Sequence, residues 1–178
     1  GDMLSRFGDE ETKKKLIPRI ASGEISGSMC LTEPDCGSDV GALKTMATVQ
    51  GDGTYLLNGA KCFITNGGGG IGLVLARIKG DPEGTKGISM FLALQDHPGK
   101  EGPNFRIAKN EDKMGMHGSF TTEVVYENSV ATLIGKPCEG FHYMLHLMNG
   151  ARIGVAFQSL GILEASIKYA LKYADERV

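Results

Sequence analysis

The sequence of 178 residues lacks three features that would place it at once in a large class of proteins. It has no excess of charge, because 19 Lys and Arg balance 21 Asp and Glu, so nothing favours binding to nucleic acid or to a membrane surface. Its longest apolar runs, such as 71–78, are too short to cross a bilayer. Residues 1–11 are polar and lack the apolar core of a signal peptide. We therefore expect no nucleic-acid or membrane partner.

Cysteine is scarce and irregularly spaced. The four cysteines form no CxxC motif and have no histidine at a metal-binding spacing; they are Cys30, Cys36, Cys62 and Cys138. This pattern indicates free thiols in a reducing compartment and predicts no zinc site. No basic residue adjoins Cys30 in the sequence, so we expect a small packing residue there and not a reactive thiol.

Glycine, by contrast, is abundant, with 26 residues scattered among short apolar runs. Glycines at such spacing predict many tight turns. A hairpin turn is expected at 51–53 and a second turn at 58–59. The expected strands are 47–50, 55–57, 61–65, 71–78, 88–94 and 121–126. Short strands separated by such turns predict a small antiparallel β-barrel or sandwich.

Helical periodicity occurs only at the two ends of the chain. Residues 9–22 predict a short helix that ends at Gly23, with Pro18 an awkward interior residue. After 135–137, apolar residues recur at three- and four-residue intervals and predict a long amphipathic helix. Its apolar positions are Ile153, Ala156, Phe157, Leu160, Leu163, Ile167, Leu171 and Ala174.

The expected fold is therefore α+β, a central barrel between a short N-terminal helix and a long C-terminal helix. We expect three segments: residues 1–25 as the end of a helical domain, 26–135 as the barrel, and 136–178 as the truncated start of a second helical domain. The helical pattern is still running at the last residue, which indicates a fragment of a larger subunit.

Three glycines satisfy the GxGxxG pattern of dinucleotide-binding loops, at Gly67, Gly69 and Gly72. That motif has to open a helix whose N-terminal amides bind the pyrophosphate. The residues that follow are strand-forming, so we expect a surface loop here.

Residues 29–42 read as a strand that ends in a tight polar loop. Apolar residues give way to Pro34 and then to Gly37-Ser38-Asp39, which offers backbone donors and small polar side chains. Loops of this kind are common ligand-binding positions. The structural alternative is that Ser38-Asp39 caps a helix or forms an Asx turn.

A second informative stretch is 61–67. Phe63 and Thr65 are two residues apart in a predicted strand, so their side chains share one face. A ring and a hydroxyl on one face suit a planar heteroaromatic cofactor. The alternative is an ordinary barrel strand with Phe63 in the core.

Together the two stretches resemble the acyl-CoA dehydrogenase family, flavoenzymes that oxidise acyl thioesters. The first stretch matches the family pattern at Cys30, Leu31, Thr32, Glu33, Gly37, Ser38, Asp39 and Ala42, and departs from it at Cys36. The second matches an aromatic-Ile-Thr-Asn-Gly run in which tryptophan is common, and Phe63 keeps the ring but loses the indole donor. The resemblance covers essentially the whole chain.

The resemblance implies an FAD site and an acyl-CoA site. The implied FAD-binding residues are Met29, Leu31, Thr32, Gly37, Ser38, Phe63, Ile64 and Thr65, with Arg177 reaching the FAD of a neighbouring subunit. The implied acyl-CoA residues are Ser38, Asn149 and Arg152. Read from its residues alone, Arg152 is an ordinary solvated charge, and the family's Phe-Gly pair after Arg177 would lie beyond Val178.

The implied reaction is α,β-dehydrogenation of an acyl-CoA to the trans-2-enoyl-CoA, in which a carboxylate takes the α-proton and the flavin takes the β-hydride. Most of the family has this Glu late in the C-terminal domain, and a minority has it where this chain has Ala151. We therefore expect no catalytic base within the chain, and an inactive fragment. His117 lies between glycines and is expected to be a structural loop residue.

The resemblance also implies partners: electron-transfer flavoprotein or a similar acceptor, and a homodimer or homotetramer in the full-length protein. It implies a role in fatty-acid metabolism, in the cytoplasm of a bacterium or the mitochondrial matrix of a eukaryote. Two alternatives remain open. One is a flavin-dependent oxidase or monooxygenase on the same scaffold, and the other is a non-catalytic flavin-binding scaffold, against which the intact Thr32, Thr65 and Arg152 argue.

Overall fold

The computed structural model describes residues 1–177 and divides the chain into two compact units. The first runs from Gly1 to Tyr143 and contains all the strands, and the second begins at Met144 and consists of helix. Each unit is described by itself below.

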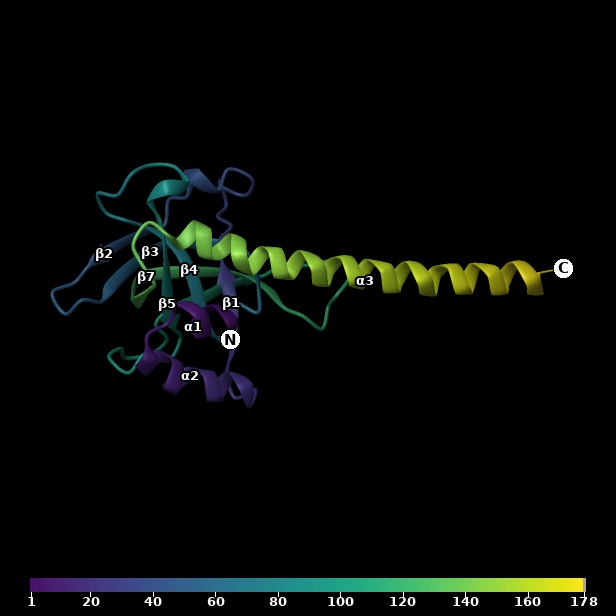
Figure 1. The fold of residues 1–178 in the computed structure, drawn as a ribbon, viewed down its shortest axis with the longest axis horizontal. Coiled ribbons are helices and arrows are strands. Elements are labelled where there is room, and N and C mark those ends of the chain that lie inside the picture. The colour runs from purple at the N-terminus through teal and green to yellow at the C-terminus, as the bar shows by residue number, and fades with distance from the viewer. Residues whose placement is uncertain (178) are drawn as a thin grey trace. The chain divides into compact units, whose positions relative to one another are not determined.

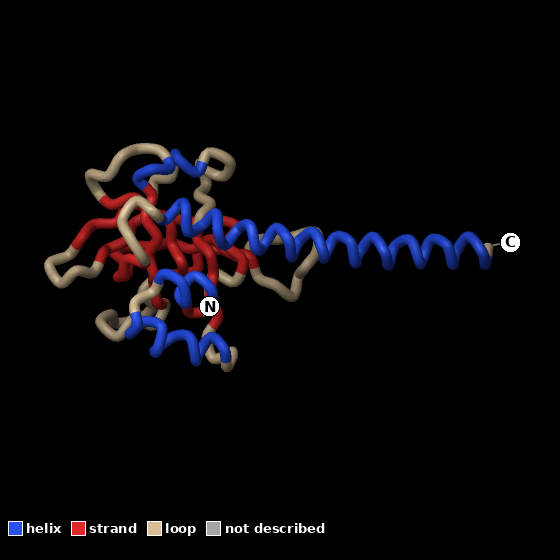
Figure 2. The backbone as a smooth tube through the Cα atoms, viewed as in Figure 1, coloured by secondary structure: helices blue, strands red, loops and turns tan. Residues whose placement is uncertain are grey.

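The strands of the first unit close into a barrel (Figure 1). They are β1 (Ser26–Cys30), β2 (Met46–Val49), β3 (Tyr55–Thr65), β4 (Gly70–Ile78), β5 (Ile88–Leu94), β6 (Arg106–Asn110) and β7 (Thr121–Ile134). Neighbouring pairs run β4–β2–β3–β7–β5, and β5 pairs with β4 to complete the ring. Most pairings are antiparallel, but β4 pairs in parallel with both β1 and β2. Figure 2 shows these strands gathered in one body.

The core of the barrel follows from side-chain alternation along the strands. β5 is buried over almost its whole length, as expected for an uninterrupted apolar run. The core cluster draws on every strand except β6 and comprises Cys30, Ala47, Leu57, Ile64, Val74, Ala76, Phe91, Ala93, Phe105, Val124, Tyr126 and Ala131.

Two short helices precede the barrel, α1 (Asp2–Phe7) and α2 (Glu10–Ala21). Asp9 caps α2, because its carboxylate accepts the backbone N–H of Thr12 at 2.8 Å. Leu16 of α2 is buried. The rings of Phe7 and Tyr143 are stacked, with their centroids 4.1 Å apart. Two 3-10 turns, η1 (Val40–Ala42) and η2 (Thr85–Gly87), complete the unit.

One expected turn is wrong. The Asn58-Gly59 pair does not reverse the chain, and β3 continues through it from Tyr55 to Thr65. The pairing of β3 with β7 shifts register between Leu57 and Gly59, and Gly59 has φ 153°, so a β-bulge occupies this position. In addition, β7 runs on to Ile134, past the expected end at residue 126, and neither β6 nor α1 was expected.

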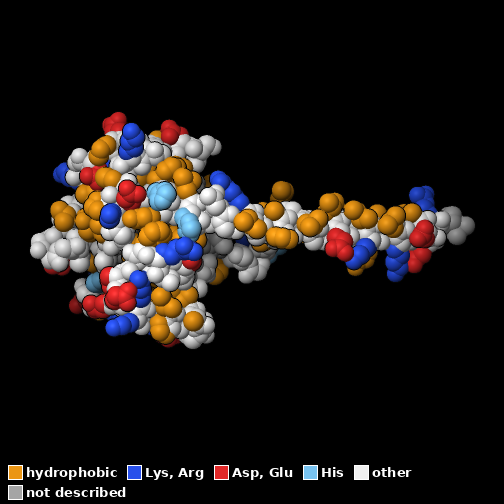
Figure 3. All heavy atoms as spheres, in the orientation of Figure 1, with side chains coloured by type: hydrophobic (Ala, Val, Ile, Leu, Met, Phe, Trp, Pro, Cys, Tyr) orange, Lys and Arg blue, Asp and Glu red, His pale blue; other side chains and the backbone are white. Residues whose placement is uncertain are grey.

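Helix α3 (Gly140–Glu176) is the one described element of the second unit. It confirms the long C-terminal helix, and its large apolar side chains, such as Phe157, Leu160 and Leu163, are exposed. Figure 3 shows apolar side chains along its length. Within the second unit there is no other described element to cover them. Among residues 1–177, no helix has both the length and the apolar content needed to cross a membrane.

Candidate functional site

The loop after β1 is a tight turn fixed by its own backbone. Glu33 and Cys36 exchange two backbone hydrogen bonds, of 3.0 and 3.1 Å, across Pro34 and Asp35. The chain then passes through Gly37 and Ser38, both exposed, into η1. β1 itself ends at Cys30, four residues before Pro34, so the strand stops earlier than the sequence predicted, whereas the tight turn lies at Pro34 and Asp35 as expected.

This loop lies against the end of β3. The Cys62 N–H donates to the carbonyl of Thr32 at 2.9 Å, and the Lys61 ammonium donates to the carbonyl of Leu31 at 3.0 Å. The two stretches singled out in the sequence are therefore side by side, with Leu31 and Thr32 adjacent to the residues that immediately precede Phe63.

Phe63 sits on a bulge with strained backbone. β3 shifts register against β7 between Lys61 and Ile64, and Phe63 has φ 57°, in the left-handed region. Its ring is 64% exposed, so the alternative of a core aromatic is wrong. A large ring presented to solvent from a strained backbone position is typical of a ligand-binding site.

The neighbours of Phe63 alternate as a strand requires. Ile64 is buried in the core cluster, so only its backbone remains available to a ligand. Thr65 is exposed, as Phe63 is. In β1, Met29 is half-buried and pairs with Leu73 of β4.

A buried ion pair underlies the loop, and the sequence analysis missed its role. Lys61 and Glu33 are 0% and 5% exposed, and the Lys61 ammonium lies 2.7 Å from Oε1 of Glu33. The same oxygen accepts the hydroxyl of Thr45 at 2.6 Å and its N–H at 3.1 Å, while Oε2 accepts the Lys44 N–H at 2.6 Å. The position of Lys61 among apolar residues of a predicted strand could have indicated a buried lysine that needs a charged partner.

The environment shifts both pKa values of this pair. Burial raises the pKa of Glu33, but the Lys61 ammonium and the donors from Thr45 and Lys44 outweigh burial and lower it. Burial lowers the pKa of Lys61 despite the attraction of Glu33. The carboxylate is thus held ionised by its donors.

Ser38 is free to meet a ligand. Its hydroxyl bonds to nothing in residues 1–177. Asp39 stands at the start of η1, but its side chain makes no capping bond, so the helix-cap alternative is not realised. The Cys36 thiol donates to the carbonyl of Asp39 at 2.8 Å and so links the two ends of this part of the loop.

The remaining predicted residues belong to the second unit. Nη1 of Arg152 donates to Oδ1 of Asn149 at 3.0 Å on one exposed face of α3. This contact brings together two of the three predicted acyl-CoA residues, whereas Ser38 belongs to the first unit. Arg177 lies just after α3, with its guanidinium 6.0 Å from the centroid of the Tyr173 ring.

Other sequence features take no part in this site. All four cysteines are free, and burial raises the pKa of the Cys30 thiol, so the expectation of a packing residue is confirmed. His117 is exposed in a turn. The turn at 66–69 joins β3 to β4, and a strand follows it as expected, but Gly72 lies within β4 and both Gly67 and Gly72 are buried, so the expectation of a surface loop through all three glycines is wrong. The described residues include no group of side chains that could hold a metal ion.

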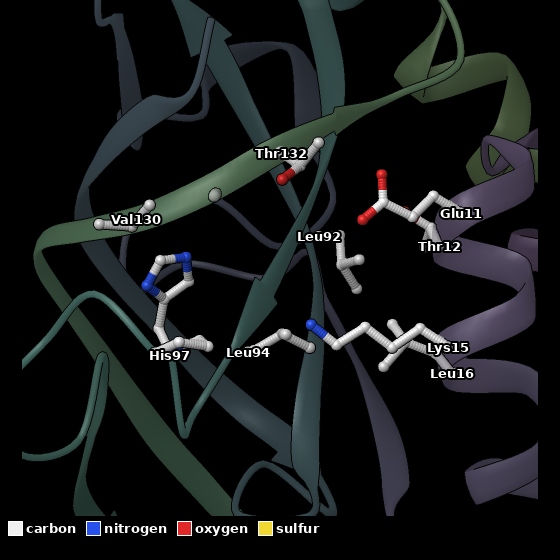
Figure 4. Close-up of a pocket in the computed structure, with 11 residues that line it drawn as sticks. Glu11, Thr12, Lys15, Leu16, Leu92, Leu94, His97, Val130 and Thr132 are labelled. Atoms are coloured by element: carbon white, nitrogen blue, oxygen red, sulfur yellow. The ribbon is translucent and has the colours of Figure 1, made fainter. Parts of the chain in front are cut away.

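A cavity of about 220 Å³ lies elsewhere in the first unit, between α2 and the strands β5 and β7. Figure 4 shows Glu11 and Lys15 extending into it from α2, opposite His97 and Thr132. None of the predicted cofactor or substrate residues lines it. The cavity is therefore separate from the candidate site.

Comparisons with known proteins identify the family of the chain. Residues 28–129 match the model of the acyl-CoA dehydrogenase middle domain. An acyl-CoA dehydrogenase of Bacillus subtilis is 44% identical over 97% of the chain, which covers 45% of that protein. The structure of butyryl-CoA dehydrogenase from Megasphaera elsdenii superimposes with a TM-score of 0.88 at 39% identity, over 99% of this chain and 46% of the other.

A third relative is an acyl-CoA dehydrogenase from Bacillus anthracis whose structure was solved in complex with FAD. It has a TM-score of 0.83 at 30% identity, over 97% of this chain and 29% of the other. The chain thus spans less than half the length of these relatives. On the strength of the family model, which matches more than half of its residues, the chain belongs to the acyl-CoA dehydrogenase family.

Proposed function

We propose that the protein of which this chain forms part is an FAD-dependent acyl-CoA dehydrogenase that converts an acyl-CoA to the trans-2-enoyl-CoA. The observation that carries the proposal is the exposed, strained Phe63 beside the Leu31–Thr32 loop. The family membership supports the choice of chemistry, and a relative solved in complex with FAD supports the choice of cofactor.

The residues present fit a flavin. The ring of Phe63 offers an exposed apolar surface on which a planar heteroaromatic system can pack. The N–H of Thr32 has no acceptor in the described part of the chain, and the hydroxyl of Thr65 has no partner there either. Two free donors beside an exposed ring match the polar edge and apolar face of an isoalloxazine.

We assign the FAD contacts to Met29, Leu31, Thr32, Gly37, Ser38, Phe63, Ile64 and Thr65, with Arg177 serving the FAD of a neighbouring subunit. Ile64 contributes through its backbone only, since its side chain is in the core. Bound FAD would accept the β-hydrogen of the substrate as hydride.

On the substrate side, we assign acyl-CoA binding to Ser38, Asn149 and Arg152. Nη1 of Arg152 donates to Oδ1 of Asn149, and the other N–H groups of the guanidinium remain available to a carbonyl or phosphate oxygen. Ala151 leaves no carboxylate next to Arg152, so the base that takes the α-proton lies outside this chain. The fragment alone is then inactive.

We further propose that residues 1–25, 26–135 and 136–178 belong to three successive domains of the full subunit. That subunit would assemble as a homodimer or homotetramer and pass its electrons to electron-transfer flavoprotein or a similar acceptor. Its compartment would be the cytoplasm of a bacterium or the mitochondrial matrix of a eukaryote.

The test uses the full-length protein, loaded with FAD, under anaerobic conditions. Addition of short-, medium- and branched-chain acyl-CoAs is expected to bleach the visible flavin spectrum with at least one of them. The 178-residue chain, treated in the same way, is expected to show no bleaching. Tight FAD binding without bleaching by any thioester would overturn the dehydrogenase in favour of an oxidase or a scaffold, and absence of FAD binding would overturn the flavin site itself.

Full-length Arg152→Ala tests the substrate assignment. It is expected to raise KM for the acyl-CoA at least about tenfold, since a charge-assisted hydrogen bond contributes about 1.5–3 kcal/mol. Lys168→Ala, which removes an exposed charge further along α3, serves as control and is expected to leave KM unchanged. An unchanged KM in Arg152→Ala would exclude this role.

A further inference from the structure

The Lys61–Glu33 pair lies beneath the loop assigned to the flavin, and both of its side chains are almost entirely buried. Lys61 is fully buried and Glu33 nearly so. The Lys61 ammonium has two acceptors, Oε1 of Glu33 at 2.7 Å and the carbonyl of Leu31 at 3.0 Å. The first contact pairs its charge, and the second is directed at the backbone of the loop.

A contribution to the folding stability of the chain does not by itself explain why an ion pair is buried here. Desolvation of two charges offsets most of their attraction, and well-packed apolar replacements of buried ion pairs are often equally or more stable. An ordinary barrel strand would place an apolar residue at position 61, as β3 does at Leu57 and Ile64. The contact with Leu31 is what an apolar residue could not make.

That contact fixes the direction of one peptide group. The peptide between Leu31 and Thr32 is trans, because the chain contains no cis bond among its described residues. In a trans peptide the C=O and the following N–H point in opposite directions. With the Leu31 carbonyl turned inward to Lys61, the Thr32 N–H is turned away from the buried ammonium, and it has no protein acceptor in residues 1–177.

The next peptide is fixed as well. The carbonyl of Thr32 accepts the N–H of Cys62 at 2.9 Å, so the loop is held at two successive carbonyls by neighbouring residues of β3. Glu33 in turn binds the N–H groups of Lys44 and Thr45, which ties Lys61 to the segment that enters β2. The loop, β2 and β3 therefore share one buried polar network.

We propose that Lys61, whose charge is paired with Glu33, is a positioning residue for the cofactor: its bond to the Leu31 carbonyl locks the Leu31–Thr32 peptide so that the Thr32 N–H is presented to the flavin. This inference rests on the proposed function for the identity of the ligand. The locking itself is a property of the chain and can be measured without FAD.

Three variants separate positioning from stability. Lys61→Met combined with Glu33→Gln removes the donor to Leu31 and leaves no unpaired charge, while the glutamine oxygen still accepts from Thr45. The bond from the Lys44 N–H to Oε2 is lost equally in Glu33→Gln alone, so the two variants differ only at Lys61. Glu33→Gln alone keeps the Lys61–Leu31 bond. Lys44→Met removes a neighbouring pair, Lys44–Asp35, in which both side chains are more than 70% exposed, and serves as the matched control.

Each variant is measured in three ways: FAD affinity of the full-length protein by flavin fluorescence, thermal midpoint, and hydrogen exchange of the Cys62 amide without FAD. The double variant is expected to bind FAD at least about tenfold more weakly, as loss of one well-aligned donor implies, and its Cys62 amide is expected to exchange about tenfold faster. Glu33→Gln and Lys44→Met are expected to match the wild type in FAD affinity within about twofold.

Wild-type FAD affinity and Cys62 protection in the double variant would overturn the inference. If the double variant does not fold, Glu33→Gln provides the test. This variant retains the Lys61–Leu31 bond, so a loss of FAD affinity in the folded Glu33→Gln protein would also contradict the inference. A wild-type protein that binds no FAD would refute the proposed function, whereas the exchange of Cys62 would still test the lock.

Discussion

At the scale of single residues, the site combines a strained backbone with an exposed ring. Phe63 occupies the left-handed region, which is costly for a bulky residue, and gains no burial in return. A stability cost retained at one position, without any packing benefit, points to a function that the isolated chain does not display.

Phe63→Gly is therefore expected to stabilise the chain by about 1 kcal/mol, because glycine adopts positive φ without strain. The same change removes the ring and is expected to weaken FAD binding. Urea unfolding and flavin titration measure the two effects. Phe63→Ala is the control: it also loses the ring but keeps the strain, so it is expected to weaken FAD binding without the gain in stability. A Phe63→Gly chain less stable than Phe63→Ala would contradict this account.

The Glu33 carboxylate gives the chain a specific acid sensitivity. Its pKa is lowered from 4.5 in the folded state, so the unfolded chain takes up the proton first as pH falls. The stabilisation by Glu33 is thus complete above about pH 4.5 and is lost as pH falls through the lowered pKa. Urea midpoints at pH 7 and pH 3 are expected to differ less in Glu33→Gln than in the wild type. An equal difference in both would show that Glu33 does not couple folding to pH.

At the scale of elements, the bulge at Gly59 positions the polar network. A Cβ at Gly59 would lie 2.5 to 2.9 Å from atoms of Thr45, the residue that donates twice to Glu33. The φ of 153° at Gly59 adds strain for any other residue. The absence of a side chain in β3 therefore allows β2 to approach closely enough for Thr45 to reach the carboxylate.

Gly59→Ala is expected to destabilise the chain by about 3 kcal/mol, through a steric clash that displaces Thr45. Gly53→Ala, in the hairpin between β2 and β3, is the matched control, because Gly53 also has positive φ but has nothing within 4 Å of an added Cβ. It is expected to cost only about 1 kcal/mol, the strain alone. Chemical denaturation compares them, and equal losses would refute the clash.

Some strands could be predicted from the local sequence and others could not. The runs at 71–78 and 88–94 form β4 and β5 almost as predicted, because buried strands are continuous apolar segments. Asn58-Gly59 has the composition of a turn, but pairing with β7 overrides that local preference. β6 is mostly exposed and polar, so it carries no alternation to detect.

At the scale of the whole molecule, the resemblance predicted the residues of the candidate site before the fold was known, while the supporting network was found only in the structure. Residue types and spacing alone left Phe63 ambiguous between core and cofactor. Lys61 and Glu33 are separated by 28 positions in the sequence, and their pairing depends on how the loop after β1 meets β3. A single sequence does not encode such a contact in any local pattern.

The second unit gives a prediction about local stability. Beyond Met144, α3 exposes most of its apolar side chains and has no other element in its own unit. Its amides are expected to exchange with solvent at least about tenfold faster than those of β5 in the buried barrel. Hydrogen exchange followed by mass spectrometry measures both segments in one experiment. Equal protection at high chain concentration that is lost on dilution would show that a second copy covers the helix.

The pairing of distant strands also affects the order in which the protein can be completed on the ribosome. β1 is the first strand to be synthesised, but the barrel closes only when β7 has been made, about 100 residues later. At about 5–20 residues per second, this delay lasts roughly 5 to 20 s. Until β7 is made, β3 and β5 each lack the strand that pairs with their second edge, so the incomplete barrel exposes apolar surface to which ribosome-associated chaperones can bind.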